Sequence, residues 1–272
     1  MAARADGSVP FDASRPHVAR VYDYLLGGKE NFAADRVVGD RILASIPEVQ
    51  LGVRAQRDVL GRVVRYLVGE AGIRQLLDIG SGLPTADNVH EIAQRIDPAT
   101  RVVYLDNDPV VLAHARGLVA DTLFAGDGAT VVADGDLRDP AGILADPDVR
   151  EHLDWEKPIG LLLCGILHYI LDEEDPAGVV TTLYEALPPG SYVFIHHLLA
   201  IDDPAAAILQ EQMRAGLGRA QFRTMEQVRA LFGGLDLVEP GLVIVPDWRP
   251  EPPAIRDHPV LEMACVGVAR KP

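Results

Sequence analysis

Residues 75–84 read Gln75-Leu76-Leu77-Asp78-Ile79-Gly80-Ser81-Gly82-Leu83-Pro84. The short apolar run ends in an acid and then in two glycines one residue apart, which is typical of a buried parallel strand that breaks into a turn. From Thr85 to Ile96, apolar side chains recur at helical spacing. The stretch therefore predicts a strand, a glycine turn and a helix, which together are the repeating unit of an α/β sheet.

The glycine turn has the features of a ligand site. Gly80 and Gly82 can adopt positive φ and let a ligand approach the bare backbone. The helix expected to start beyond Pro84 would offer unpaired N–H groups and the positive end of its dipole. A dinucleotide fingerprint places a third glycine where this chain has Thr85. The turn thus predicts a small-molecule site and disfavours a pyrophosphate site, and a tight turn without a ligand is the alternative.

A second predicted strand, residues 101–106, ends in an acid. Asp108 followed by Pro109 is typical of the first residues of a helix, so the strand is again followed by a helix. Asp106 lies about 20 residues beyond the glycine turn, the separation at which a carboxylate binds the ribose hydroxyls of an adenosine cofactor. The spacing favours such a cofactor, and a solvated loop acid is the alternative.

Composition limits the class of partner. The chain has 272 residues, of which 48% are hydrophobic, and a net charge of −15 with a sequence pI near 4.9. An acidic chain without a Lys/Arg cluster repels a phosphate backbone, so we expect no nucleic-acid partner. No apolar run approaches the roughly 18 residues of a membrane span, which favours a cytoplasmic protein without membrane contact. Cys164 and Cys265 lie in apolar runs and predict buried, inert thiols.

The chain divides into three expected parts. Residues 1–16 are expected to be a flexible N-terminus, 17–72 an N-terminal helical cap, and 73–272 the ligand-binding core, with a helical insertion at about 202–222. Within the cap, Asn31 is a candidate N-cap of the second helix.

The end of the chain predicts two further strands, residues 235–245 and 261–269, without a helix between them. Two adjacent strands joined by a short connection form an antiparallel pair. The first of the two is interrupted by Pro240-Gly241. This ending is unlike that of a dinucleotide-dependent dehydrogenase.

Three separated motifs resemble one known family. They are residues 19–36 (ARVYDYLLGGKENFAADR), 77–85 (LDIGSGLPT) and 103–109 (VYLDNDP). In this order they resemble the actinobacterial S-adenosyl methyltransferase family, long catalogued as a domain of unknown function, over about residues 16–269. The resemblance implies a class I, Rossmann-like methyltransferase fold, with a mostly parallel seven-stranded α/β sheet of order 3-2-1-4-5-7-6 and a helical cap. It also implies S-adenosyl-L-methionine as methyl donor, S-adenosyl-L-homocysteine as product and an unidentified small-molecule acceptor.

The resemblance extends to individual cofactor residues. The glycine turn would lie along the methionyl part of the cofactor, with Asp78 at its amino end. After a third predicted strand, residues 129–134, an acid would accept the adenine amino group; Asp136 with Leu137 matches that position, Asp134 competes with it, and an Asx-turn is the alternative. Small residues after the fourth strand would leave room for the sulfonium. The expected cofactor residues are Asp78, Gly80, Ser81, Gly82, Asp106, Asn107, Asp136, Leu137, Cys164 and Gly165.

Histidines and the cap supply the candidate catalytic and lid residues. His168, after the fourth strand, is a candidate general base; a packing role is the alternative, because alignment alone can carry much of a methyl transfer. His196 and His197 end the fifth predicted strand, so three imidazoles are expected near one pocket. We expect no metal, since no carboxylate or thiol stands at ligand spacing. The expected lid or substrate residues are Tyr22, Gly28, Lys29, Asn31 and His197, with a purely structural turn as the alternative.

Two rival functions are kept beside the methyltransferase. One is a non-catalytic protein that binds S-adenosylmethionine or S-adenosylhomocysteine on the same fold. The other is an NAD(P)-dependent oxidoreductase, which the missing third glycine and the helix-free last pair of strands disfavour. The sequence does not predict the oligomeric state.

Overall fold

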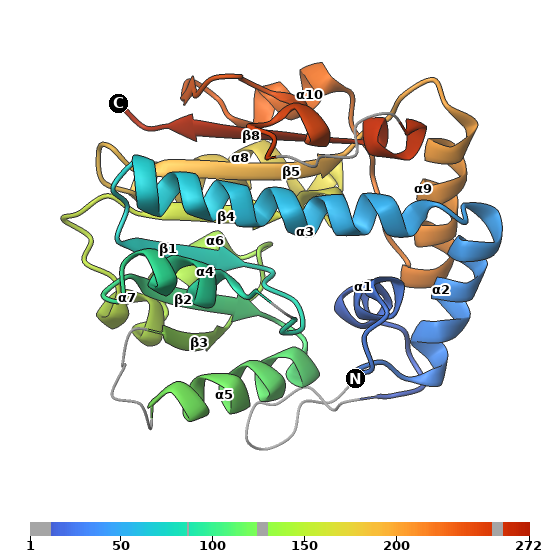
Figure 1. The fold of residues 1–272 in the computed structure, drawn as a ribbon, viewed down its shortest axis with the longest axis horizontal. Helices are drawn as coiled ribbons and strands as arrows, with labels where there is room; N and C mark the ends of the chain where they lie inside the picture. Colours follow the sequence, from blue (N-terminus) through green and yellow to red (C-terminus); the bar gives the residue numbers. More distant parts are fainter. Residues whose placement is uncertain (1–11, 86, 124–129, 252–257) are drawn as a thin grey trace.

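The computed structural model describes residues 12–85, 87–123, 130–251 and 258–272. Figure 1 shows a sheet of order β3-β2-β1-β4-β5-β8-β6, with β7 paired to β8 outside that path. Strands β1 to β5 run parallel, whereas β8 runs antiparallel to β5, β6 and β7. The strands are β1 (Gln75–Ile79), β2 (Arg101–Asp106), β3 (Thr130–Asp134), β4 (Gly160–Cys164), β5 (Tyr192–Leu198), β6 (Asp236–Leu237), β7 (Val243–Ile244) and β8 (Ala264–Arg270).

The predicted sheet order is confirmed, but the described residues form eight strands rather than seven. The segment expected to form one strand over 235–245 is split at Pro240-Gly241 into β6 and β7, and both pair with β8. Proline cannot donate to a strand ladder and Gly241 has a φ of 91°, so the chain turns there instead of continuing. Position 129 of the predicted third strand lies outside the described residues.

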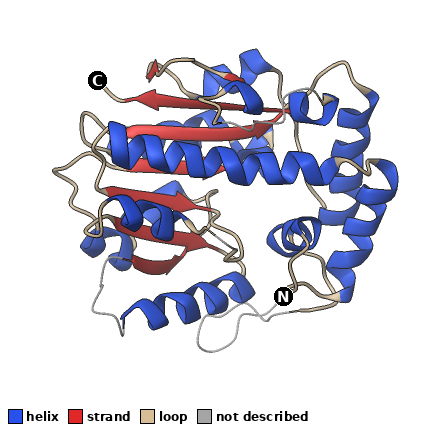
Figure 2. Cartoon of the chain, in the orientation of Figure 1, coloured by secondary structure: helices blue, strands red, loops and turns tan. Residues whose placement is uncertain are grey.

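Helices lie on both faces of the sheet, as Figure 2 shows by colour. Five of them begin with an aspartate followed by proline, at Asp108, Asp139, Asp146, Asp175 and Asp203, and each carboxylate accepts a backbone N–H of the first turn at 2.7–3.0 Å. The helices are α1 (Val18–Leu26), α2 (Ala33–Ser45), α3 (Val49–Arg65), α4 (Val89–Ile96), α5 (Pro109–Leu123), α6 (Pro140–Ala145), α7 (Pro147–His152), α8 (Pro176–Ala186), α9 (Pro204–Leu217) and α10 (Met225–Leu231).

Two helix starts differ from the expectation. Helix α4 begins at Val89, because Asn88 accepts the N–H of Thr85 at 2.9 Å and Glu91 accepts the N–H of Asn88 at 2.7 Å. These side chains cap the helix, so its N-terminus does not follow the glycine turn directly. The N-cap of α2 is Phe32 rather than Asn31.

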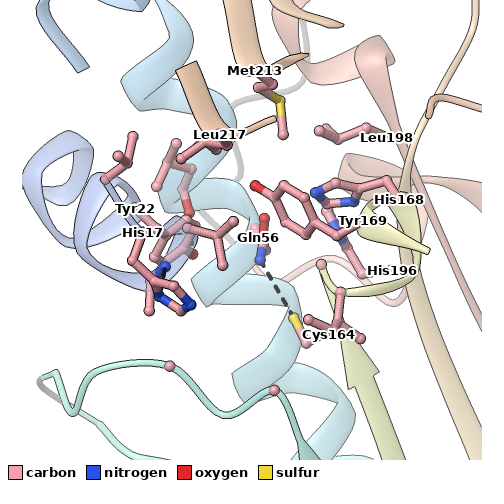
Figure 3. A pocket seen from close by; sticks show the side chains of 18 of the residues that line it. His17, Tyr22, Gln56, Cys164, His168, Tyr169, His196, Leu198, Met213 and Leu217 are labelled. Atoms are coloured by element: carbon pink, nitrogen blue, oxygen red, sulfur yellow. Dashed lines mark hydrogen bonds between the residues drawn. The ribbon is translucent and has the colours of Figure 1, made fainter. Parts of the chain in front are cut away.

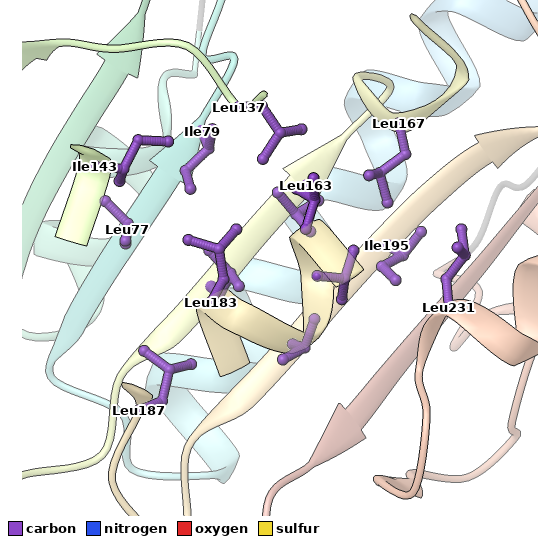
Figure 4. Packing of buried hydrophobic residues seen from close by; sticks show 14 of the residues in the cluster. Leu77, Ile79, Leu137, Ile143, Leu163, Leu167, Leu183, Leu187, Ile195 and Leu231 are labelled. Carbon is purple, nitrogen blue, oxygen red and sulfur yellow. The ribbon is translucent and has the colours of Figure 1, made fainter. Parts of the chain in front are cut away.

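The core consists of separate apolar clusters on the two faces of the sheet. Alternate residues of β1 point to opposite faces, so Leu77 packs against the cluster that includes α6, α8 and α10, while Leu76 packs with α3 and α4. Figure 4 shows the first cluster, with Leu163 and Ile195 between β1 and Leu231 of α10. Truncation of such a residue to alanine costs about 2–5 kcal/mol.

A third apolar cluster joins α1, α2 and α9 at one end of the molecule (Figure 1). Helix α3 belongs to two clusters: Val49 and Val53 pack in this one, whereas Val63 and Val64 pack on the sheet. The cap expected over 17–72 is therefore anchored to the core through the second half of α3. Among the helices that the structure describes, we find none with both the length and the apolar character required to cross a bilayer.

Candidate functional site

A cavity of about 350 Å³ lies at the carboxyl ends of β1, β2 and β4, beneath the N-terminal helices (Figure 3). Open α/β sheets bind ligands at this edge. All ten residues expected to hold the cofactor line the cavity, as do Tyr22 and His168. The fold therefore brings together residues from β1 to β4 that lie up to 87 positions apart, from Asp78 to Gly165.

The glycine turn has the backbone conformation that its glycines permit. Gly80 has a φ of 72° and Gly82 a φ of 69°, both in the left-handed region. The N–H groups of Gly80 and Ser81 donate to the carbonyl of Leu105 at 2.8 and 3.2 Å. A Cβ on Gly80 would come within 2.9 Å of the Ile166 side chain, so this turn is closely packed against the segment after β4.

Asp106 is held by backbone donors on both of its oxygens. Oδ1 accepts the N–H groups of Asn107 and Asp108 at 2.8 and 3.0 Å, and Oδ2 accepts that of Gly82 at 2.9 Å. Burial raises the pKa of Asp106, and these N–H groups oppose that rise. A carboxylate has about four acceptor positions, so one position on Oδ2 is left for a ligand at the cavity wall.

Asp78 is a buried carboxyl with no hydrogen-bond partner among the described residues. Burial raises its pKa to about 7, with Asp106 adding to the rise and Arg57 opposing it. A buried polar group normally has a partner in the folded protein. Asp78 therefore marks a position at which a ligand can supply a donor or a positive charge.

Asp136 is paired with Arg138, and both residues line the cavity. Its carboxylate accepts from the side chain and backbone N–H of Arg138 and, at 3.1 Å, from the amide of Asn107. The hydrogen bonds of Arg138 hold the pKa of Asp136 down at about 2. The bond to the Arg138 N–H, two residues on, has the form of the Asx-turn kept as the alternative. Asp134, the competing acid, is exposed and lies outside the cavity.

His168 and His196 line the cavity, whereas His197, whose ring centroid lies 5.7 Å from that of His168, does not. The Nδ1 atoms of His168 and His196 are buried and have no hydrogen-bond partner in the described part of the chain. Burial and the neighbouring His197, His196 and Arg223 lower the pKa of His168 well below its usual range. The ring is therefore neutral at neutral pH.

The expected lid turn is not at the cavity. Gly28, Lys29 and Asn31 do not line it, and Lys29 is exposed. The turn instead surrounds Asp23, whose carboxylate accepts the N–H of Glu30 at 2.9 Å and the amide of Asn31 at 2.8 Å. This arrangement matches the structural alternative for the turn. Of the expected lid residues, Tyr22 alone lines the cavity.

Several residues at the cavity were not predicted. Gln56 of α3 donates to Sγ of Cys164 at 3.7 Å, and Nδ1 of His17 lies 2.8 Å from Oδ2 of Asp108. The sequence does mark Gln56 as unusual, because it is a polar residue at helical spacing between Val53 and Leu60 on an otherwise apolar face. No local pattern distinguishes His17.

The comparisons with known proteins agree with this geometry. The family model for S-adenosyl methyltransferases matches residues 4–272. A candidate methyltransferase from Thermobifida fusca YX is 44% identical, with a TM-score of 0.90 over 96% of each chain. A DUF574 family protein from Streptomyces avermitilis MA-4680 is 42% identical, with a TM-score of 0.90 over 96% of this chain and 99% of that one.

A more distant O-methyltransferase family protein from Burkholderia thailandensis is 17% identical, with a TM-score of 0.52 over 85% of this chain and 59% of that one, and shares the fold. A search of curated proteins found no match. The family match spans the glycine turn, Asp106 and the helices over the cavity. The chain belongs to the S-adenosyl methyltransferase family and is a methyltransferase that depends on S-adenosyl-L-methionine.

Proposed function

We propose that Asp78, Asp106 and Asp136 hold the methyl donor at three points, and that a small-molecule acceptor binds between His168 and the N-terminal helices. The observation that carries the proposal is the buried, unpartnered carboxyl of Asp78 at the cavity wall. The ammonium group of an amino acid supplies the donors and the charge that this carboxyl lacks.

The other two acids fit the rest of the same molecule. The free acceptor position of Asp106 suits a ribose hydroxyl, and a charge-assisted hydrogen bond of this kind contributes about 1.5–3 kcal/mol. Asp136 keeps its negative charge through its pairing with Arg138, so it can accept the adenine amino group. The three acids therefore match the amino acid, sugar and base in order along the cavity.

The donor, when bound, supplies a methyl group on a positively charged sulfur. The protein's part is to align the acceptor and to exclude water, and alignment alone can account for much of the acceleration. His168 is neutral, so it can accept a hydrogen bond from an acceptor hydroxyl. An oxygen that gains a methyl group becomes strongly acidic, so a base of low pKa is sufficient to take its proton.

Titration calorimetry tests the assignment of the donor residues. Wild-type protein should bind S-adenosylmethionine and S-adenosylhomocysteine and not NAD, and Asp78→Asn should weaken both adenosyl ligands. Equal affinity in the variant and the wild type would remove Asp78 from the site.

The net charge of −15 supports an acceptor other than a nucleic acid. Cys164 and Cys265 form no disulfide, which supports a reducing, cytoplasmic location.

A further inference from the structure

The half of the cavity that lies beyond Cys164 has a different lining from the half at the strand ends. Figure 3 shows this half, here called the acceptor chamber, between α1, α9 and the turn that follows β4. The Leu198 side chain, at the end of β5, closes one side. The chamber is lined chiefly by Tyr22, Tyr169, Leu198, Met213, Leu217 and Met263.

Charged side chains are concentrated away from the chamber. Most of those that line the cavity, such as Asp78, Asp106 and Asp136, lie at the strand ends. Arg219 of the chamber side is already paired, since its two terminal nitrogens donate to Glu174 at 3.1–3.2 Å and one also donates to the carbonyl of Tyr169. Arg57 also lines the cavity, but it borders the strand-end half, where its Nη2 donates to the carbonyl of Asp87 at 3.2 Å. Among the described residues, a charged ligand in the chamber would therefore meet no cation that is not already bonded, which is strongly unfavourable.

Two tyrosine hydroxyls in the chamber differ in their bonding. The hydroxyl of Tyr22 donates to the carbonyl of Val53 at 3.2 Å, so its proton is already used. The hydroxyl of Tyr169 has no partner among the described residues, and Figure 3 shows it directed into the cavity. The Tyr169 ring lies against the His168 imidazole, with centroids 4.3 Å apart. One donor and one neutral imidazole thus stand together at the chamber wall.

We propose that the chamber binds an uncharged, largely apolar acceptor that presents one hydroxyl group to Tyr169 and His168. A hydroxyl can accept a hydrogen bond from Tyr169 and donate one to an imidazole nitrogen, which no carboxylate or ammonium group can do. The apolar walls bind the rest of the molecule and keep out water. The inference rests on the proposed function, because the donor must fill the strand-end half for the chamber to be the acceptor site.

Methionine methyl signals can report on the chamber directly. Of the four methionines, Met213 and Met263 line it, Met225 packs against the sheet elsewhere, and Met1 lies outside the described residues. Protein labelled with 13C at the methionine methyl groups is saturated with S-adenosylhomocysteine and titrated with 2-naphthol or with 2-naphthoate. We expect 2-naphthol to shift the Met213 and Met263 signals and leave Met225 in place, and 2-naphthoate to bind at least about tenfold more weakly.

Matched variants separate the hydroxyl contact from the charge selection. Tyr169→Phe removes one oxygen and should lower the affinity for 2-naphthol by about three- to tenfold, while the affinity for naphthalene stays unchanged. Leu217→Lys adds a cation to the chamber and should shift the preference toward 2-naphthoate. Ile208→Lys adds the same charge to an exposed position of the same helix and should leave both affinities unchanged.

The outcomes distinguish the chamber from the donor site. Failure of S-adenosylhomocysteine to bind, measured by calorimetry, would refute the donor site itself. If it binds and 2-naphthoate matches 2-naphthol, or if neither probe moves Met213 and Met263, the proposed acceptor class is wrong. Unchanged 2-naphthol affinity in Tyr169→Phe would remove the hydroxyl contact from the proposal.

Discussion

Nη1 of Arg223 lies 3.0 Å from Nε2 of His197, so a buried guanidinium joins the segment after α9 to the end of β5. The same guanidinium donates to the carbonyls of Leu167 and Ile170 at 3.1 and 2.8 Å. These carbonyls flank His168 and Tyr169 in the chain. Arg223 therefore fixes the turn that carries the two polar groups of the acceptor chamber.

Replacement of Arg223 should loosen that turn. Arg223→Met leaves the Ile170 carbonyl without a donor and removes one of the two donors of the Leu167 carbonyl, which keeps the Ile170 N–H at 3.1 Å. A buried acceptor without a donor costs about 1–3 kcal/mol. We expect the free energy of unfolding in urea to fall by an amount in this range or above it. Arg229→Met, at an exposed position of α10, is the control and should change stability little. Similar stability in the two variants would show that Arg223 does not hold the turn.

Replacement of Asp106 should weaken cofactor binding. Asp106→Ala removes the acceptor for a ribose hydroxyl together with three backbone hydrogen bonds, so we expect the affinity for S-adenosylhomocysteine to fall tenfold or more, about 1.4 kcal/mol or above. Asp134→Ala, at the exposed end of the neighbouring strand, should bind as the wild type does. Calorimetry of both variants checks the expectation, and unchanged affinity in Asp106→Ala contradicts it.

Asp78 should make both stability and binding depend on pH. Burial raises its pKa from the ordinary value of 3.8 to about 7. Between these values the folded protein holds a proton that the unfolded chain releases, so the contribution of Asp78 to the free energy of unfolding falls as pH rises. In the folded protein the carboxylate that would bind an ammonium group forms around the raised pKa, so affinity for S-adenosylhomocysteine should rise from about pH 6 to about pH 8. Asp78→Asn should abolish the rise in affinity, and the difference in free energy of unfolding between wild type and variant should change with pH between about 4 and 7. A difference that stays constant with pH would assign the dependence to another group.

Two contacts between a histidine and a carboxylate join the cap to α5 and to Asp108 before it, and we expect them to contribute unequally. His17 pairs with the buried Asp108 at 2.8 Å, whereas His114 pairs with Glu30 at 3.3 Å on the surface. Exposed pairs contribute little. Amide hydrogen exchange in α1 should therefore accelerate in His17→Ala and stay unchanged in His114→Ala. Equal exchange in the two variants would mean that the buried pair does not secure α1.

Much of the fold could be predicted because its signals are local. Apolar runs that end in glycine or aspartate predict β1 and β2, and the helix-free ending predicts the antiparallel strand β8. The start of α4 was placed too early, directly after Pro84. Asn88 and Glu91 cap the helix instead, and a sequence with several polar residues in this stretch does not show which of them forms the cap. The split into β6 and β7 depends on which residues of the segment pair with β8. That pairing register cannot be derived from the sequence of the segment alone.

The strand-end half of the cavity was predicted more completely than the chamber. Its residues sit in motifs next to strand ends, so their positions follow from the topology. The chamber is assembled from α1, α9 and the residues before β8, whose mutual placement depends on packing between distant segments. Arg223 and Gln56 were not predicted as site residues for the same reason. Arg223 bonds to the carbonyl of Leu167, 56 residues away in the chain, and Gln56 bonds to Cys164, 108 residues away.

The two halves of the cavity also come from different stretches of the chain. Residues from Asp78 to Gly165 line the strand-end half, whereas Met213, Leu217 and Met263 of the chamber lie beyond that interval. Substitutions in α9 can therefore change which acceptor is recognised while the donor site keeps its sequence. If the chamber binds the acceptor as proposed, α9 is a part of the fold in which protein engineers could alter acceptor recognition without changing the donor site.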